Sequence, residues 1–220
     1  MIDWREIDTV LLDMDGTLLD LHFDSHFWLE HLPRRYVELH QLDQASQDAL
    51  KARIMGEQGT LNWYSLAYWS RELNVDIVAL KREVQHLIGL RSDALDFLTW
   101  LKQAPPRVVL ATNADRASLA LKLPLTGLEN YLDAIISSED VGAAKEEQAF
   151  WFALQEREPF DPARTLFIDD NARVLESARE FGIKHLLGIK QPDSQRPEKE
   201  LQEFIALDRF ARLLPAELPG

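Results

Sequence analysis

The sequence predicts an α/β protein in which an all-helical domain is inserted into a doubly wound, mostly parallel sheet. Three observations predict this fold. Short apolar runs alternate with amphipathic helical patterns through most of the chain. The runs are continuously apolar, which is typical of parallel strands that are buried on both faces. The stretch between the first and second runs, residues 21–90, carries helical patterns alone.

Apolar runs and the patterns between them define the expected strands and helices of the sheet region. The expected strands are Thr9–Leu12, Arg107–Ala111, Ala134–Ile136, Thr165–Ile168 and His185–Ile189. The expected helices between them are Asp93–Lys102, Ala114–Leu123, Lys145–Glu156 and Ala172–Phe181. Lys190–Glu200 contains two prolines and is the stretch that most resembles a disordered segment. The tail Pro215–Gly220 is expected to fray.

Helical patterns in the inserted stretch cover Ser25–Leu39, Gln44–Ile54, Leu61–Leu73 and Ile77–Ile88. Four helices in one crossover favour a separate domain over helices that lie flat on the sheet, although the latter stays possible. We therefore expect a helical domain over 21–90 and an α/β core made of 1–20 plus 91–220. Hinges are expected near Asp20–Phe23 and Gly89–Ser92.

Composition excludes several function classes. The 220 residues include 37 acidic and 24 basic side chains, so the net charge is −13. Such a surface repels nucleic-acid polymers and anionic membranes. The chain has no cysteine, which excludes thiolate zinc sites, iron–sulfur clusters and cysteine nucleophiles. The N-terminus lacks a basic region followed by an apolar one, so we expect a soluble, cytoplasmic protein. Its oligomeric state is left open between monomer and homodimer.

Polar side chains follow three of the expected strands. Asp13-Met-Asp15-Gly-Thr17 follows the first strand, Thr112-Asn113 the second, and Asp169-Asp170 the fourth. Ligands of open α/β sheets bind outside the carboxyl ends of the strands, so these groups are expected to converge there. Clustered carboxylates repel one another unless a cation neutralises them. A hard, oxygen-liganded ion such as Mg²⁺ fits this donor set.

The Asp13-x-Asp15-Gly16 spacing indicates chemistry as well as charge. Two carboxylates two residues apart at a strand end can face one crevice, and Gly16 lets the chain turn sharply beside an anion. A carboxylate can act as a nucleophile in phosphoryl transfer and then carries the phosphoryl group. The alternative is a turn that carries surface acids. It is disfavoured because three of the expected strands end in polar groups, which chance alone rarely produces.

These motifs resemble, in order and spacing, the four motifs of the haloacid dehalogenase superfamily. The resemblance covers the whole chain, because residues 21–90 lie where that superfamily places a helical cap of its first type. It implies a Mg²⁺-dependent phosphomonoester hydrolase that forms an aspartyl-phosphate. Asp13 would be the nucleophile and Asp15 the general acid and base.

The resemblance also implies ligands for the metal and for the phosphate. Mg²⁺ would be held by Asp13, the Asp15 backbone carbonyl and Asp170, with Asp169 acting through water or as a partial ligand. The phosphate would be bound by Gly16, Thr17, Thr112, Asn113 and Lys145. Lys145 is followed by Glu146, where the superfamily often has proline. Lys122 and Lys190 are therefore kept as competitors for its role.

More detailed similarity is found in Leu11–Leu21, Thr60–Tyr64, Lys145–Gln148 with Trp151, and Arg164–Asp170. These runs resemble a bacterial GMP/IMP 5′-nucleotidase subgroup of the superfamily, which implies a purine mononucleotide as the substrate. The candidates for contact with its base or ribose are His22, Phe27, Asn62, Trp63 and Tyr64. The alternative is that Trp63 and Tyr64, together with Tyr68 and Trp69 in the same predicted helix, form a core stripe.

Other functions stay open at this point. A phosphatase for phosphoglycolate or sugar phosphates, or a phosphomutase, would use the same motifs. A dehalogenase of the superfamily has no need of an acid at the position of Asp15, so the presence of Asp15 argues against that activity. A receiver-like phosphoacceptor domain also combines paired acids with a threonine and a lysine, but there the acid pair comes before the phosphoacceptor. Here Asp169-Asp170 comes last.

Overall fold

A computed structural model describes residues 2–201 and 203–215 of the chain. Its centre is a six-stranded parallel sheet with the strand order β3-β2-β1-β4-β5-β6. The strands are β1 (Thr9–Leu12), β2 (Arg107–Thr112), β3 (Ala134–Ser137), β4 (Thr165–Asp169), β5 (His185–Ile189) and β6 (Ile205–Leu207). The doubly wound α/β fold and all five predicted strands are confirmed. The three-residue edge strand β6 was not predicted, because it is short and leaves Ile205 69% exposed.

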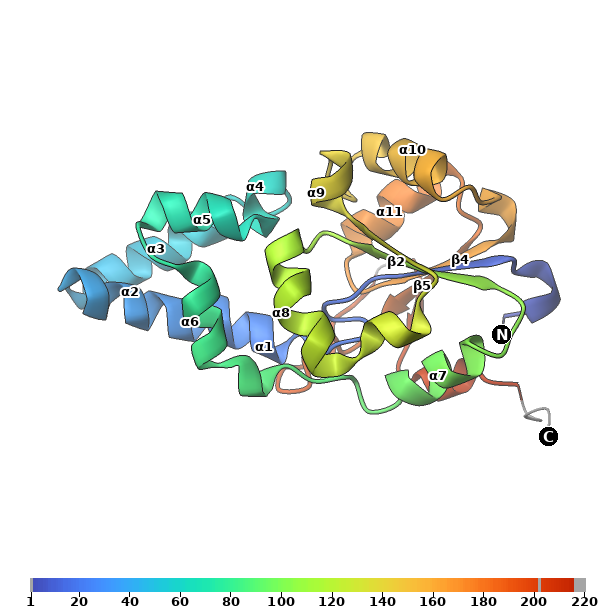
Figure 1. Ribbon diagram of the computed structural model, residues 1–220, viewed down its shortest axis with the longest axis horizontal. Helices are drawn as coiled ribbons and strands as arrows, with labels where there is room; N and C mark the ends of the chain where they lie inside the picture. The colour runs from blue at the N-terminus through green and yellow to red at the C-terminus, as the bar shows by residue number, and fades with distance from the viewer. Residues whose placement is uncertain (1, 202, 216–220) are drawn as a thin grey trace.

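Helices cover both faces of the sheet (Figure 1). α7 (Ala94–Leu101) and α8 (Arg116–Thr126) pack on one face, and α10 (Gln148–Arg157) and α11 (Ala172–Phe181) on the other. The short helix α9 (Ser138–Val141) follows β3. One-turn 3₁₀ helices lie at Trp4–Glu6, Gln85–Leu87, Leu128–Tyr131, Pro162–Arg164 and Phe210–Leu213. Each face has its own apolar cluster, so the strands between them are buried, as their continuous apolar runs predict.

Two predicted helices begin later than their patterns indicate. α8 begins at Arg116, because the carboxylate of Asp115 caps it by accepting from the Ser118 N–H. α10 begins at Gln148, so Lys145 precedes the helix and does not lie in its first turn. The backbone N–H of Lys145 donates to the side chain of Asn113 (2.9 Å), which ties this stretch to the end of β2.

Residues 22–87, here called the helical segment, contain helices and no strand. They form α1 (His22–His26), a π-helical turn (Phe27–His31), α2 (Leu32–His40), α3 (Gln44–Gly56), α4 (Leu61–Tyr64), α5 (Leu66–Leu73) and α6 (Ile77–Glu83). The predicted helix Leu61–Leu73 is broken at Ser65, whose side chain caps α5. The segment has an apolar cluster that also takes in Leu121 of α8, and it extends beyond one end of the sheet (Figure 1).

Two linkers join the helical segment to the sheet region, and they pair with each other. Leu19 and Leu90 form an antiparallel bridge. The N–H of Asp20 donates to the carbonyl of Gly89 (3.0 Å), and the N–H of Arg91 donates to the carbonyl of Leu18 (2.9 Å). The segment thus leaves and rejoins the sheet region along one short two-stranded ribbon.

Part of the stretch that most resembles a disordered segment, Lys190–Glu200, packs beside this ribbon. The N–H of Leu21 donates to the carbonyl of Pro192 (2.9 Å), and Asp193 is 3% exposed. Local composition does not reveal these tertiary contacts, and residues 194–200 of the stretch are exposed. The expected fraying at Pro215–Gly220 falls mostly on residues 216–220, which lie outside the described residues. Within the described residues, no helix is both long and apolar enough to cross a membrane.

Candidate active site

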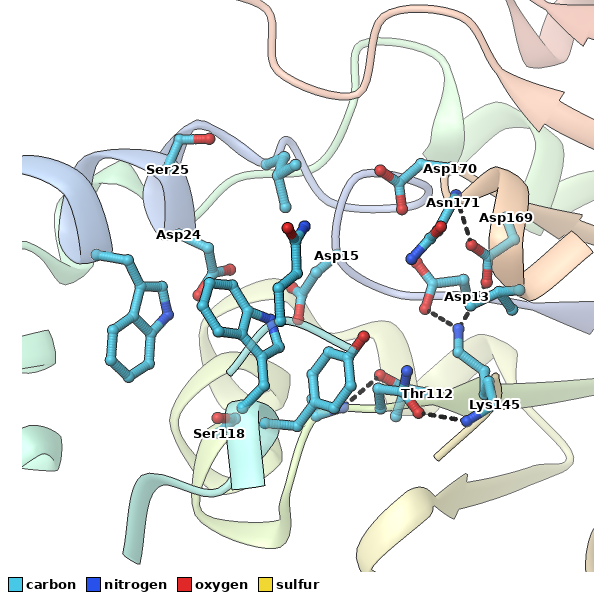
Figure 2. A pocket seen from close by; sticks show the side chains of 18 of the residues that line it. Asp13, Asp15, Asp24, Ser25, Thr112, Ser118, Lys145, Asp169, Asp170 and Asn171 are labelled. Carbon is cyan, nitrogen blue, oxygen red and sulfur yellow. Dashed lines mark hydrogen bonds and ion pairs between the residues drawn. The ribbon is translucent and has the colours of Figure 1, made fainter. Parts of the chain in front are cut away.

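The carboxyl ends of β1, β2 and β4 open into a cavity of about 390 Å³ between the sheet and the helical segment (Figure 2). The register places Leu12 of β1 beside Leu110 of β2 and Ile168 of β4, so the residues that follow these strands meet. Seven of the residues predicted to act in catalysis or to bind the metal or the phosphate line the cavity. They are Asp13, Asp15, Thr112, Asn113, Lys145, Asp169 and Asp170.

Lys145 joins two of the carboxylates. Its Nζ donates to Oδ1 of Asp13 (2.5 Å) and to Oδ2 of Asp169 (2.6 Å), and its side chain is 2% exposed (Figure 2). Burial lowers the pKa of Lys145, but the two carboxylates outweigh burial and raise it overall. Burial, together with the charges of Asp169 and Asp170, raises the pKa of Asp13 well above its usual value. The ammonium is therefore the cation that stabilises this cluster in the structure.

The two competitors for the role of Lys145 lie elsewhere. The ammonium of Lys190 pairs with Glu198 (2.6 Å), and Lys190 does not line the cavity. Lys122 does line it, but its ammonium contacts Asp15 and not Asp13. Lys145 is thus the lysine placed against the predicted nucleophile.

The carboxylates can hold a hard divalent cation. Asp13, Asp169 and Asp170 each offer an oxygen, and these atoms lie within 4.8 Å of one another. An all-oxygen, anionic donor set of this kind suits Mg²⁺. The main chain is pressed against this cluster at Gly16, where φ is +86° and an added Cβ would lie 2.8 Å from Cγ of Asp170. Only glycine fits there, which explains the glycine after Asp15.

Asp170 and Asp169 have further partners at the edge of the cluster. The Nζ of Lys199 donates to Oδ2 of Asp170 (2.8 Å). Burial is the main reason that the pKa of Asp170 is raised, and the charge of Asp169 adds to it. The backbone N–H of Asn171 donates to Oδ1 of Asp169 (2.7 Å), while the Asn171 side chain caps α11.

The predicted phosphate ligands differ in how they meet the cavity. The hydroxyl oxygen of Thr112 accepts from the N–H of Ala114 (3.0 Å) at the cavity wall. Asn113 is held on both sides, since it accepts from the Lys145 N–H and donates to Oε2 of Glu146 (2.9 Å). Thr17 is fully buried and does not line the cavity, and within the described residues its hydroxyl has no hydrogen-bond partner.

Asp15 belongs to a second ionic group, and it lies between Asp24 of that group and Asp13 (Figure 2). The Nζ of Lys122 on α8 donates to Oδ1 of Asp15 (2.7 Å) and to Oδ2 of Asp24 on α1 (2.6 Å). The Nζ of Lys81 on α6 donates to the other oxygen of Asp24 (2.6 Å). Burial raises the pKa of Asp15, although Lys122 opposes this effect.

One face of the first helix of the helical segment forms part of the cavity wall. Leu21, Asp24, Ser25 and Trp28 line the cavity, at the i, i+3, i+4 and i+7 spacing of a single helical face. Phe27 lies on the opposite face and is fully buried in the segment's apolar cluster. The expectation that Phe27 contacts a ligand is therefore wrong in this arrangement.

The other predicted contacts from the helical segment divide in two. Trp63 and Tyr64 line the cavity, and the Tyr64 hydroxyl donates to Oε1 of Glu146 (2.7 Å). Asn62 is exposed and does not line the cavity. His22 does not line it either, because its ring faces Asp193 with Nδ1 3.6 Å from a carboxylate oxygen.

Several cavity residues were not predicted. The sequence did carry a signal for Ser118 and Lys122, because they lie four residues apart on one face of α8, shortly after Asn113. Asp24 and Trp28 share a face in the same way. Lys199 gave no signal, since it comes from a loop 29 residues after its partner Asp170.

Comparisons with known proteins agree with this geometry. The model of the haloacid dehalogenase-like hydrolase family matches residues 7–182. The GMP/IMP nucleotidase YrfG of Escherichia coli (strain K12) is 41% identical over 216 residues, covering 98% of this chain and 97% of that protein. A phosphorylated carbohydrates phosphatase of Thermotoga maritima is 22% identical, covering 83% of this chain and 85% of that protein.

Solved structures show the same fold. The HAD phosphatase of Thermococcus onnurineus superposes with a TM-score of 0.79 at 20% identity, covering 94% of this chain and 96% of that one. The family match spans both the Asp13 motif and the acid pair at the end of β4, so the receiver-domain alternative is set aside. The chain is therefore an enzyme that belongs to the haloacid dehalogenase-like hydrolase family.

Proposed function

We propose that the protein is a Mg²⁺-dependent 5′-nucleotidase that releases phosphate from purine nucleoside 5′-monophosphates such as GMP and IMP. The observation that carries the hydrolytic chemistry is the arrangement around Asp13, where a buried lysine and two further aspartates surround one carboxylate. The 41% identity to a GMP/IMP nucleotidase over almost the whole chain supports the substrate class.

In this proposal Asp13 is the nucleophile. Its free oxygen attacks phosphorus in line, and the bond between phosphorus and the ribose 5′-oxygen breaks as the aspartyl-phosphate forms. Asp15 gives its proton to the departing oxygen. It then takes a proton from the water that attacks the aspartyl-phosphate, which frees Asp13 and inorganic phosphate. Lys145 and Thr112 stabilise the charge on the phosphoryl oxygens.

Asp13, Asp170 and the backbone carbonyl of Asp15 would hold Mg²⁺, with Asp169 as a partial or water-mediated ligand. The bound ion supplies charge neutralisation at the phosphoryl oxygens. The close approach of Asp13, Asp169 and Asp170 supports this assignment.

We also propose that residues 21–90 act as a cap domain that selects the substrate. The base would lie against the indoles of Trp28 and Trp63, which line the cavity nearly parallel to each other, at 24°. Stacking on aromatic side chains suits any planar base. This assignment replaces Phe27 with Trp28 among the predicted contacts and retains Trp63.

The test is a phosphate-release screen of nucleoside monophosphates and sugar phosphates with Mg²⁺, run beside Asp13→Asn. Wild-type protein should hydrolyse GMP and IMP, and the variant should lose almost all turnover. Equal turnover by the variant would refute the role of Asp13. Hydrolysis of sugar phosphates without GMP or IMP would refute the nucleotidase assignment and keep the phosphatase chemistry.

A further inference from the structure

The ionic group around Asp15 contains four charged side chains that lie against one another at the cavity wall. They alternate in sign in the order Asp15, Lys122, Asp24 and Lys81, with contacts of 2.6 to 2.7 Å between neighbours. Both lysines are 1% exposed. Burying an ammonium is unfavourable unless it is paired, and buried ion pairs are seldom more stable than apolar residues of the same size. Stability alone therefore does not explain this group.

The contact with Asp15 uses only one of its two oxygens. Lys122 binds Oδ1, and across the described residues no side chain or backbone group donates to Oδ2. Asp15 lines the cavity. Figure 2 places it between Asp24 and the Asp13 cluster. A carboxyl group held by one oxygen presents the other in a fixed direction, which is the geometry that a proton donor requires.

The two functional carboxylates are held by different parts of the chain. Lys145 binds Asp13 and Asp169, all from the sheet region. Lys122 lies on α8 of the sheet region, but its second partner, Asp24, lies on α1 of the helical segment. The sheet region alone therefore builds the nucleophile, whereas the acid is completed only when the helical segment is seated.

Lys81 fixes Asp24 in turn. Its ammonium binds the second oxygen of Asp24 and lies 4.9 Å from the ring centres of Phe23 and Phe27. Cation–π contact with these buried rings holds the ammonium in place without adding another acid. Asp24 is thus anchored to the core of the helical segment and not to its surface.

We propose that Lys122 and Asp24 are positioning residues for Asp15, and that docking of the helical segment through Asp24 aligns the general acid with the leaving group. This inference rests on the proposed hydrolysis through Asp13 and Asp15. It assigns to the helical segment a part in the chemical step, in addition to substrate selection.

Leaving-group dependence tests the proposal. The 5′-oxygen of GMP leaves as an alkoxide and needs a proton, whereas p-nitrophenolate leaves without one. In each case kcat/KM covers the steps up to departure of the leaving group. We expect Asp24→Asn and Lys122→Met to lower kcat/KM for GMP at least about tenfold and to leave that for p-nitrophenyl phosphate unchanged. Combining the two substitutions should add little, because both act through Asp15.

Glu83→Gln is the matched control, since Glu83 lies on α6 with Lys81 but pairs with His31 and Arg35. This substitution should leave kcat/KM unchanged for both GMP and p-nitrophenyl phosphate. Equal losses of kcat/KM on both substrates in the Asp24 and Lys122 variants, or no loss on GMP, would overturn the proposal. Thermal melting identifies variants that fail to fold. If Lys122→Met does not fold, Asp24→Asn alone decides, because asparagine keeps the shape of the side chain.

The same test separates this inference from the nucleotidase assignment. Ribose 5-phosphate also has an alkoxide leaving group. If wild-type protein hydrolyses it but not GMP, the nucleotide specificity is wrong. Ribose 5-phosphate then replaces GMP in the test of Lys122 and Asp24. A loss on ribose 5-phosphate alone supports the proposal, and equal losses on ribose 5-phosphate and p-nitrophenyl phosphate, or no loss on ribose 5-phosphate, overturn it.

Discussion

The hydroxyl of Tyr64 in the helical segment donates to Oε1 of Glu146, which directly follows the lysine that binds Asp13. The other oxygen of Glu146 accepts from the side-chain amide nitrogen of Asn113, and Oδ1 of Asn113 accepts from the backbone N–H of Lys145. Burial, and next the charge of Glu146, raise the pKa of Tyr64, so it stays a donor. One chain of hydrogen bonds therefore runs from the helical segment to the backbone of Lys145.

We predict that Tyr64→Phe lowers kcat/KM for the nucleotide about 10- to 100-fold, because a hydrogen bond to a charged acceptor contributes about 1.5–3 kcal/mol. Steady-state kinetics on GMP would measure this. Tyr36→Phe is the control, since Tyr36 packs against His40 and does not line the cavity. Unchanged kinetics in Tyr64→Phe would show that the contact has no functional role.

The assignment of Lys145 can be tested against its former competitor. Lys145→Met should reduce kcat at least about 100-fold, because it removes a buried positive charge beside the phosphoryl group. Lys190→Met should leave kcat as it is, because Lys190 pairs with Glu198 away from the cavity. A large loss in Lys190→Met would contradict the assignment.

Asp24 gives a prediction on pH and stability. Burial acts against its charged form, but the ammonium groups of Lys122 and Lys81 outweigh burial and hold the pKa of Asp24 far below its usual value. A carboxyl group with a depressed folded-state pKa stabilises the fold above its unfolded pKa, which is about 3.9. That stabilisation is lost as the pH falls through the folded-state value.

The difference in the free energy of unfolding between wild type and Asp24→Asn should therefore be constant from pH 7 to 5. Below about pH 4 it should shrink by about 1.4 kcal/mol per pH unit. Urea unfolding at several pH values measures it. A decline that is already complete at pH 5 would show that another group is responsible.

For the base, we predict that Trp28→Leu and Trp63→Leu each lower kcat/KM on GMP about 5- to 100-fold, the effect of removing one stacking partner. Leucine keeps much of the apolar surface but lacks the flat aromatic face. Activity on ribose 5-phosphate, which has no base, serves as the internal control and should be retained. A parallel loss on ribose 5-phosphate would point to a defect in folding.

Lys199 bears on metal affinity. Its ammonium occupies Oδ2 of Asp170, and a positive charge at that oxygen competes with a cation. Lys199→Met should therefore lower the Mg²⁺ concentration that gives half-maximal activity. Asp170→Asn should raise it strongly. If Lys199→Met instead weakens activation by Mg²⁺, the lysine supports the metal site and does not compete with it.

The sheet and the residues at its strand ends could be predicted because both depend on local sequence. Continuous apolar runs identify buried parallel strands, and Asp13, Thr112 and Asp169 stand where those runs end. Topology then brings them together without further information. The role of Lys145, by contrast, came from resemblance, because nothing local distinguishes it from Lys122 or Lys190.

The cavity wall made by the helical segment was predicted less well. Phe27 and Trp28 are neighbours in sequence, but helical geometry puts them on opposite faces, and the choice between faces depends on how the helix docks. The contact of Lys122 with Asp24 spans 98 residues of sequence, so no local pattern indicates it. Such pairs become visible only in three dimensions.

The short ribbon formed by Leu19 and Leu90 has a consequence for how such a chain can be rebuilt. Because the helical segment enters and leaves side by side, the two chain connections of 22–87 lie at one place, and its other links to the sheet region are side-chain contacts such as that of Asp24 with Lys122. Exchanging it for the matching stretch of a relative leaves the strand order untouched. Chimeras made at this ribbon would thus transplant substrate choice, provided that the donor brings an acid to the place of Asp24.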